Sequence, residues 1–432
     1  MSARDLPAPL PRRNAAAIVV LCFLIAVLEG YDIQAFGVAA PLLVAELGLD
    51  AGQQGFAASI AMMGLIAGAF IGGSSADRLG RRPVLVASVL IFGAGSVWTG
   101  LVEGYDALLA ARAVTGLGFG GALPLLIAVA AEVSPPERRA LTTSFMFCGM
   151  PIGGAGVSLF AGLSSGADSW RLIFIVGGVL PILLAFAIVR VLPETRPAQA
   201  GESGNALEAL FGGRRALATL LLWAVNFLTL VTLYLMLNWL PSLVVASGQS
   251  PAVGASAALS FNLVGAAGAL AFGWMADRYG IRGPLSFGYA ALAVALLLLA
   301  GSTSVELILL LAAACGFFTL GTQYALYSLP PAIYPAGVRA MGAGASIAVG
   351  RLGSIAGPML AGMARQAGAS PAEVLRMLVP VAVMAGIAAL LLSLTASGRA
   401  LRGAGQPMAM KLEGACAGSA PGEGKTTWST AK

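Results

Sequence analysis

Two similar stretches lie 200 residues apart in this chain. The first is GSSADRLGRR at 73–82, and the second is GWMADRYGIR at 273–282. The same offset relates Pro135 to Pro335. Because one constant offset relates several similar positions, the sequence indicates two structural halves with the same arrangement of elements.

The remaining sequence is too apolar for a soluble fold. Hydrophobic residues make up 58% and charged residues 10% of the 432 residues, whereas soluble domains carry about 25% charged residues. Long apolar runs without two-residue alternation favour helices over a β-barrel. The sequence predicts an all-α membrane protein with twelve transmembrane helices in two six-helix halves related by pseudo-two-fold symmetry. Such repeats place a binding site between the halves, reached alternately from either side.

The expected spans are each near the roughly 20 residues that cross a bilayer. They are 15–44, 53–75, 83–102, 107–131, 141–164, 171–192, 216–241, 252–275, 284–302, 306–330, 341–363 and 374–396. The expected organisation is an N-terminal arm (1–14), an N-terminal six-helix bundle (15–192), a linker (193–215), a C-terminal six-helix bundle (216–396) and a disordered tail (397–432).

Basic residues are distributed unevenly around these spans. With the N-terminus inside, most of the 25 Lys and Arg residues fall on the cytoplasmic side. The exceptions are Arg171, Arg365 and Arg376 outside, and Arg112 and Arg351 within spans. This pattern predicts a multi-pass protein of a bacterial-type inner membrane with both termini cytoplasmic. It also accounts for the net charge of +6 without a nucleic-acid partner.

Several chemistries are excluded by composition. The chain has no histidine, and its four cysteines are scattered. Histidine-based catalysis is therefore excluded, and neither a disulfide framework nor a metal cluster is expected. The chain also contains no nucleotide-binding loop. We therefore expect no enzyme activity and no cofactor.

The first span carries an acidic pair, Glu29 and Asp32, three residues apart. That spacing puts both carboxylates on one helix face. Two carboxylates in a low dielectric favour proton binding and titrate as a coupled pair. The pair is therefore predicted to couple transport to a proton gradient. The alternative is that the pair is solvated at the end of the span, but the segment 33–43 stays mostly apolar beyond it.

The two repeated stretches resemble the signature loop of the major facilitator superfamily. In that loop, the glycine would allow two helices to approach closely, and the charged side chains would stabilise the end of a helix. The resemblance implies a conformational latch between the halves; the alternative is that the arginines only set topology. The residues assigned to the latch are Gly73, Asp77, Arg78, Gly80, Arg81, Arg82, Asp277, Arg278, Glu132 and Arg339.

Other positions are similar to the aromatic acid:proton symporter family of that superfamily, whose first span usually reads Asp-Gly-Phe-Asp. Arg112 opens a segment similar to the superfamily's span 4 motif, and Asn238 begins an Asn-Trp-Leu-Pro match. The stretches 29–34, 148–153 and 349–353 most resemble the 3-(3-hydroxyphenyl)propionate transporter branch of that family. An intramembrane arginine costs about 3 kcal/mol, so it normally has a partner and a role. The alternative for Arg112 is a purely structural ion pair.

The resemblance implies symport of an aromatic carboxylate, such as a hydroxyphenylpropionate-like acid, with protons. One arginine would bind the substrate carboxylate, and the other would pair with an acid of span 1. The expected substrate-binding residues are Arg112, Arg351, Asn238, Gln323 and Tyr327. Packing is the alternative role for the tyrosine. Alternative functions are transport of a dicarboxylate or sugar acid and, from a different class, a non-transporting membrane sensor. The expected partners are a small organic anion, protons and the lipid bilayer, with the protein a monomer.

Overall fold

The computed structural model describes residues 12–133, 142, 145–164, 169–192, 210–212, 215–334 and 339–395. Within these residues, twelve helices are long and apolar enough to cross a membrane. The predicted helical fold with twelve spans is therefore confirmed. The predicted tail, together with most of the arm and of the linker, falls outside the described residues.

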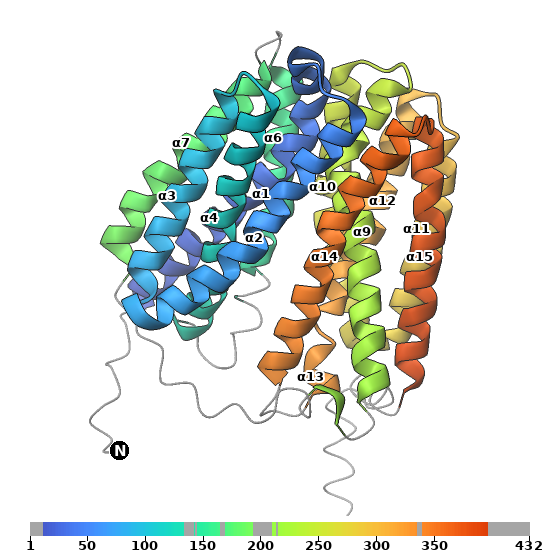
Figure 1. Ribbon diagram of the computed structural model, residues 1–432. Coiled ribbons are helices and arrows are strands. Elements are labelled where there is room, and N and C mark those ends of the chain that lie inside the picture. The colour runs from blue at the N-terminus through green and yellow to red at the C-terminus, as the bar shows by residue number, and fades with distance from the viewer. Residues whose placement is uncertain are drawn as a thin grey trace, which may run out of the picture.

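The helices form two bundles that follow one another along the chain (Figure 1). The first contains α1 (Arg12–Leu47), α2 (Ala51–Leu79), α3 (Arg81–Gly100), α4 (Tyr105–Val133), α6 (Gly149–Leu163) and α7 (Ser169–Val191). The second contains α9 (Ala216–Ala246), α10 (Pro251–Tyr279), α11 (Arg282–Ala300), α12 (Val305–Leu326), the short α13 (Pro330–Ile333), α14 (Arg339–Gln366) and α15 (Pro371–Leu394).

The repeat seen in the sequence is also a repeat of structure. The bounds of α2 and α10 differ by 200 residues, and each helix ends before a glycine with positive φ, Gly80 (φ 95°) or Gly280 (φ 74°). This conformation favours glycine because it has no Cβ. The N-terminus of each of these two helices is capped by a polar side chain. Asp50 accepts a hydrogen bond from the backbone N–H of Gln53, and Ser250 accepts one from the backbone N–H of Val253.

The two bundles contact each other through α2 with α14, α6 with α10, and α1 with α9. Small residues bring these helices close together. A Cβ added to Gly55 would lie 2.8 Å from the Pro358 carbonyl oxygen, and one added to Gly37 would lie 2.0 Å from the Leu237 carbonyl oxygen. The Ser59 hydroxyl also donates to the Ile355 carbonyl at 2.8 Å. These contacts close the bundles together at the end where α1 runs into α2.

At the opposite end, where α1 begins, the ribbons of α2 and α14 diverge (Figure 1). Gly73 and Gly273 lie toward this end, and a Cβ added to either would meet nothing within 4 Å. The close helix approach expected at Gly73 is therefore not present in this arrangement, in which α2 and α14 diverge.

Two arginines assigned to the latch make contacts within their own bundles. Arg82 donates to the Val189 carbonyl of α7, and the Arg278 guanidinium lies 5.6 Å from the Trp274 ring centroid. Gly80 joins α2 to α3, where Arg81 is the first helical residue. Arg78 is exposed. The side chains of four other charged latch residues lie outside the described part of the chain: Asp77, Glu132, Asp277 and Arg339.

Candidate functional site

The two acids of α1 have different partners. An Arg112 guanidinium nitrogen lies 2.9 Å from the Asp32 carboxylate, and Ser96 donates to the other carboxylate oxygen at 2.7 Å. The same guanidinium lies over the rings of Phe36 and Phe174, 5.4 and 5.8 Å from their centroids. Asp32 and Arg112 are 0% and 1% exposed, so this ion pair is enclosed within the first bundle.

Glu29 faces a different environment from Asp32. It is 1% exposed, and neither carboxylate oxygen has a hydrogen-bond partner among the described residues. Burial is the largest electrostatic influence on Glu29, and the attraction of Arg351, on α14 of the second bundle, opposes it. The expected acidic pair is therefore divided: Asp32 is neutralised inside one bundle, while Glu29 interacts with a charge across the interface.

A cavity lies between the bundles. Its lining includes Gly30, the residue after Glu29 in α1, whereas Glu29 itself is not part of the lining. The empty volume of the cavity is about 640 Å³, including the part open to solvent. Both halves contribute to its lining: Gly30, Ile33, Gln34, Phe147, Met150, Pro151, Leu230, Leu233, Tyr234, Leu237, Asn262, Leu320, Gln323, Tyr324, Tyr327 and Arg351. The walls are mostly apolar and aromatic, with a few polar groups between them.

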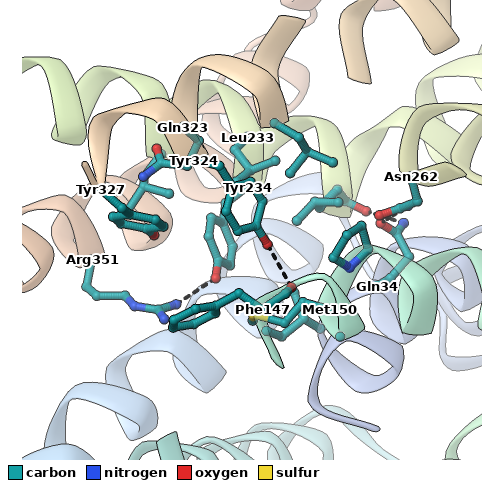
Figure 2. A pocket seen from close by; sticks show the side chains of 16 residues that line it. Gln34, Phe147, Met150, Leu233, Tyr234, Asn262, Gln323, Tyr324, Tyr327 and Arg351 are labelled. Carbon is teal, nitrogen blue, oxygen red and sulfur yellow. Dashed lines mark hydrogen bonds between the residues drawn. The ribbon is translucent and has the colours of Figure 1, made fainter. Parts of the chain in front are cut away.

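Arg351 supplies the positive charge of the lining (Figure 2). Its guanidinium donates to the Tyr234 hydroxyl on α9 at 2.7 Å. The Phe147 and Tyr327 rings are stacked with centroids 6.2 Å apart, so an aromatic contact crosses from one bundle to the other. The Tyr324 hydroxyl donates to the Phe147 carbonyl at 3.1 Å, which adds a polar contact between the same segments.

Amide side chains occupy two further places in the lining. Gln34 on α1 donates to the Leu237 carbonyl at 2.8 Å and accepts from Asn262 on α10 at 3.0 Å. Gln323 on α12 donates to the Asn226 amide oxygen at 3.4 Å, while its own amide oxygen has no partner among the described residues. Both amides are therefore held by the second bundle.

Of the five expected substrate-binding residues, the structure brings Arg351, Gln323 and Tyr327 together in the lining. Arg112 is bound to Asp32 and is not part of the lining. Asn238 is also outside it, because its amide donates to the Tyr234 carbonyl of its own helix at 2.9 Å.

Three lining residues that were not predicted are Phe147, Asn262 and Gln34. A polar amide inside a span was a usable signal for the last two, because such groups seldom face lipid. Phe147 carried no signal, because an aromatic residue in a span usually packs.

The comparisons with known proteins agree with this architecture. The family model described as Major Facilitator Superfamily matches residues 22–358. The chain belongs to the major facilitator superfamily. A bacterial homologue of the human lysosomal transporter Spinster, in an inward-facing and unoccupied conformation, has the same fold: the TM-score is 0.74 at 18% identity, over 91% of this chain and 99% of that one.

Several relatives of this superfamily member are named as transporters of aromatic acids. The 3-(3-hydroxyphenyl)propionate transporter of Escherichia coli K12 is 39% identical over 377 residues, covering 86% of this chain and 92% of the relative. The 4-hydroxybenzoate transporter of Pseudomonas putida is 32% identical, covering 79% and 84%. The resemblance seen in the sequence is confirmed, and the protein is a multi-pass membrane transporter, not an enzyme.

Proposed function

We propose that this superfamily transporter takes up an aromatic monocarboxylate together with protons, by alternating access. The cargo is a hydroxyphenylpropionate-like acid. The observation that carries the proposal is the position of Arg351, which presents a guanidinium to a cavity with aromatic walls. The buried carboxylate of Glu29, one residue along α1 from the lining residue Gly30, has no hydrogen-bond partner among the described residues.

Arg351 is suited to hold a carboxylate. A guanidinium has five N–H donors in a planar fork, and Tyr234 accepts from one terminal nitrogen. That bond fixes the orientation of the fork, so the other donors can bind a carboxylate at two points. Stacking against Tyr327 and Phe147 would hold the ring of the cargo. The names of the relatives support an aromatic cargo.

One basic residue in the lining supports a monocarboxylate over a dicarboxylate. The second intramembrane arginine, Arg112, has Asp32 as its partner within the first bundle. A dicarboxylate would need that arginine released into the cavity, at the cost of an unpaired buried Asp32. Breaking a buried ion pair in this way costs about 3–5 kcal/mol.

Proton coupling follows from the charges of the empty cavity. Glu29 and Arg351 attract each other across the interface, and in the proposed cycle their opposite charges offset one another before the cargo binds. When the cargo carboxylate binds Arg351, two negative groups share one cation in a low dielectric, and Glu29 binds a proton to restore neutrality. The loaded cavity then carries the same net charge as the empty one. The proposed stoichiometry is one proton for each carboxylate.

The proposed orientation places both termini in the cytoplasm and the chain in a bacterial-type inner membrane, following the distribution of arginines. In that orientation, the end where α2 and α14 diverge faces the cytoplasm. The signature loops, including Arg78 and Arg278, would then meet and latch when the bundles close at this end. We propose that the protein works as a monomer, because the cavity is completed by one chain.

Uptake into proteoliposomes under an imposed pH gradient tests the proposal. The panel is 3-(3-hydroxyphenyl)propionate, 4-hydroxybenzoate, succinate and gluconate. We expect accumulation of the aromatic acids only, abolished by a protonophore. Arg351→Lys should lose most uptake, because an ammonium lacks the planar fork. The matched control is Arg376→Lys at an exposed position of α15. Accumulation of succinate or gluconate alone would overturn the proposal.

A further inference from the structure

The amide oxygen of Gln323 is a polar atom of the cavity without an identified partner. The side chain is 2% exposed and belongs to the lining, and its oxygen has no hydrogen-bond partner among the described residues. A buried acceptor left without a hydrogen bond costs about 1–3 kcal/mol, so an exception of this kind needs an explanation.

The orientation of this amide is fixed by its neighbours. The Asn226 amide nitrogen donates to the Leu222 carbonyl at 3.0 Å and to the Ser346 hydroxyl at 2.9 Å. A carbonyl can only accept, so the nitrogen of Asn226 must face Leu222, and its oxygen is left for Gln323. The nitrogen of Gln323 therefore faces Asn226 at 3.4 Å, and rotating the Gln323 amide would bring two oxygens together.

We propose that the oxygen of Gln323 is the acceptor for a hydrogen-bond donor on the ring of the cargo, which makes the transporter selective for hydroxylated aromatic acids. This inference rests on the proposed function and adds a second polar contact to it. The carboxylate of the cargo binds Arg351 on α14, and the ring hydroxyl donates to Gln323 on α12. Figure 2 shows the Tyr327 ring between these two side chains in the view drawn.

The selectivity does not depend on whether water hydrates the empty cavity. A cargo that fills the space next to Gln323 displaces any water from its oxygen. A ring hydroxyl replaces the lost hydrogen bond, whereas a bare ring does not. An ether oxygen at the same position is worse, because two acceptors then face each other without a proton between them. Sites built to bond a hydroxyl reject the analogue that lacks it far more strongly than apolar pockets reject a hydroxyl.

Four analogues separate donor recognition from size and polarity: 3-(3-hydroxyphenyl)propionate, 3-(3-aminophenyl)propionate, 3-phenylpropionate and 3-(3-methoxyphenyl)propionate. Each competes with the uptake of labelled 3-(3-hydroxyphenyl)propionate in proteoliposomes. We expect the hydroxyl and amino compounds to compete at least tenfold better than the unsubstituted acid, and the methoxy compound to be the weakest. Equal competition by all four would overturn the inference.

The variant Gln323→Met removes the acceptor and keeps a side chain of similar length. We expect the preference for the hydroxylated over the unsubstituted acid to fall to within about twofold. The second variant, Asn226→Ala, frees the Gln323 amide to rotate and should reduce the preference by a smaller factor. The matched control is Gln249→Leu, since Gln249 lies in the connection after α9 and donates to the Thr303 carbonyl. An unchanged preference in Gln323→Met would also overturn the inference.

This design separates the two levels of the proposal. If the wild-type protein accumulates no aromatic acid, the proposed function fails. If it accumulates aromatic acids without preferring a ring donor, the proposed function stands and the role of Gln323 fails. Thermal unfolding of each detergent-solubilised variant identifies any loss of uptake caused by misfolding.

Discussion

The Asp32 carboxylate and the Arg112 guanidinium lie 2.9 Å apart, both buried within the first bundle. The Ser96 hydroxyl satisfies the second carboxylate oxygen at 2.7 Å. These two contacts hold α1 against α4 and α3. Neither Asp32 nor Arg112 belongs to the lining of the cavity. A function for Arg112 in direct cargo binding would need this pair to open.

The first prediction concerns the stability of that pair. Arg112→Gln leaves a buried carboxylate without its cation, which destabilises a fold by about 3–5 kcal/mol. The double variant Asp32→Asn, Arg112→Gln removes both charges and should recover most of the loss. Thermal unfolding in detergent measures both effects. A double variant as unstable as the single one would contradict a compensated pair.

The second prediction assigns proton coupling to Glu29. Glu29→Gln places a neutral amide where the proposed mechanism binds a proton, so the carrier mimics the protonated state. We expect loss of accumulation driven by a pH gradient, with exchange of internal for external substrate retained. Glu306→Gln, at an exposed position in the first turn of α12, is the matched control. Accumulation by Glu29→Gln at the wild-type level would exclude this role.

The third prediction concerns the crossing of α1 and α9. A Cβ at Gly37 would lie 2.0 Å from the Leu237 carbonyl oxygen, a backbone atom that cannot rotate away. Gly37→Ala should therefore force the bundles apart at their closed end and reduce uptake more than tenfold.

Two further glycines serve as references for this crossing. Gly156→Ala meets nothing within 4 Å and should transport normally. In Gly116→Ala, the new methyl group collides with the Ala61 carbonyl inside the first bundle, so this variant should have both reduced uptake and a lower unfolding temperature. Normal uptake by the Gly37 variant would show that this contact is not needed for transport.

The fourth prediction concerns the amide link between the bundles. Gln34 bonds the Leu237 carbonyl and the Asn262 amide, so it joins α1 to α9 and α10. Gln34→Leu removes both bonds and should open the closed end more often. A cysteine introduced at Ser242, in a background without native cysteines, should then react several-fold faster with a membrane-impermeant thiol reagent. Gln249→Leu provides the comparison, and an unchanged rate would argue against the link.

Much of the fold could be predicted because its determinants are local. The apolar runs specify helices, since a backbone in lipid must satisfy its own hydrogen bonds. The 200-residue offset predicted paired elements, and α2 and α10 have bounds that match at that offset. Boundaries were less accurate: α1 extends from Arg12 to Leu47, beyond the expected 15–44.

The candidate site was only partly predictable from helical spacing. Residues three apart share a helix face in the broad sense, but their side chains point about 60° apart around the axis. That angle is enough for Asp32 to meet Arg112 on α4 while Glu29 has no ion-pair partner in the first bundle among the described residues and is attracted by Arg351 on α14. Spacing within one helix cannot reveal which neighbouring helix each side chain meets.

The sequence by itself determined that the chain crosses a membrane twelve times in two related halves and carries Glu29, Asp32, Arg112 and Arg351 far from the ends of its spans. Hydrophobicity and repetition are properties of the chain, readable before it folds. Only the tertiary structure decided how those charges are paired and which arginine lines the cavity. Pairing depends on contacts between helices distant in sequence, and a buried charge is compensated by whichever opposite charge the packing brings near.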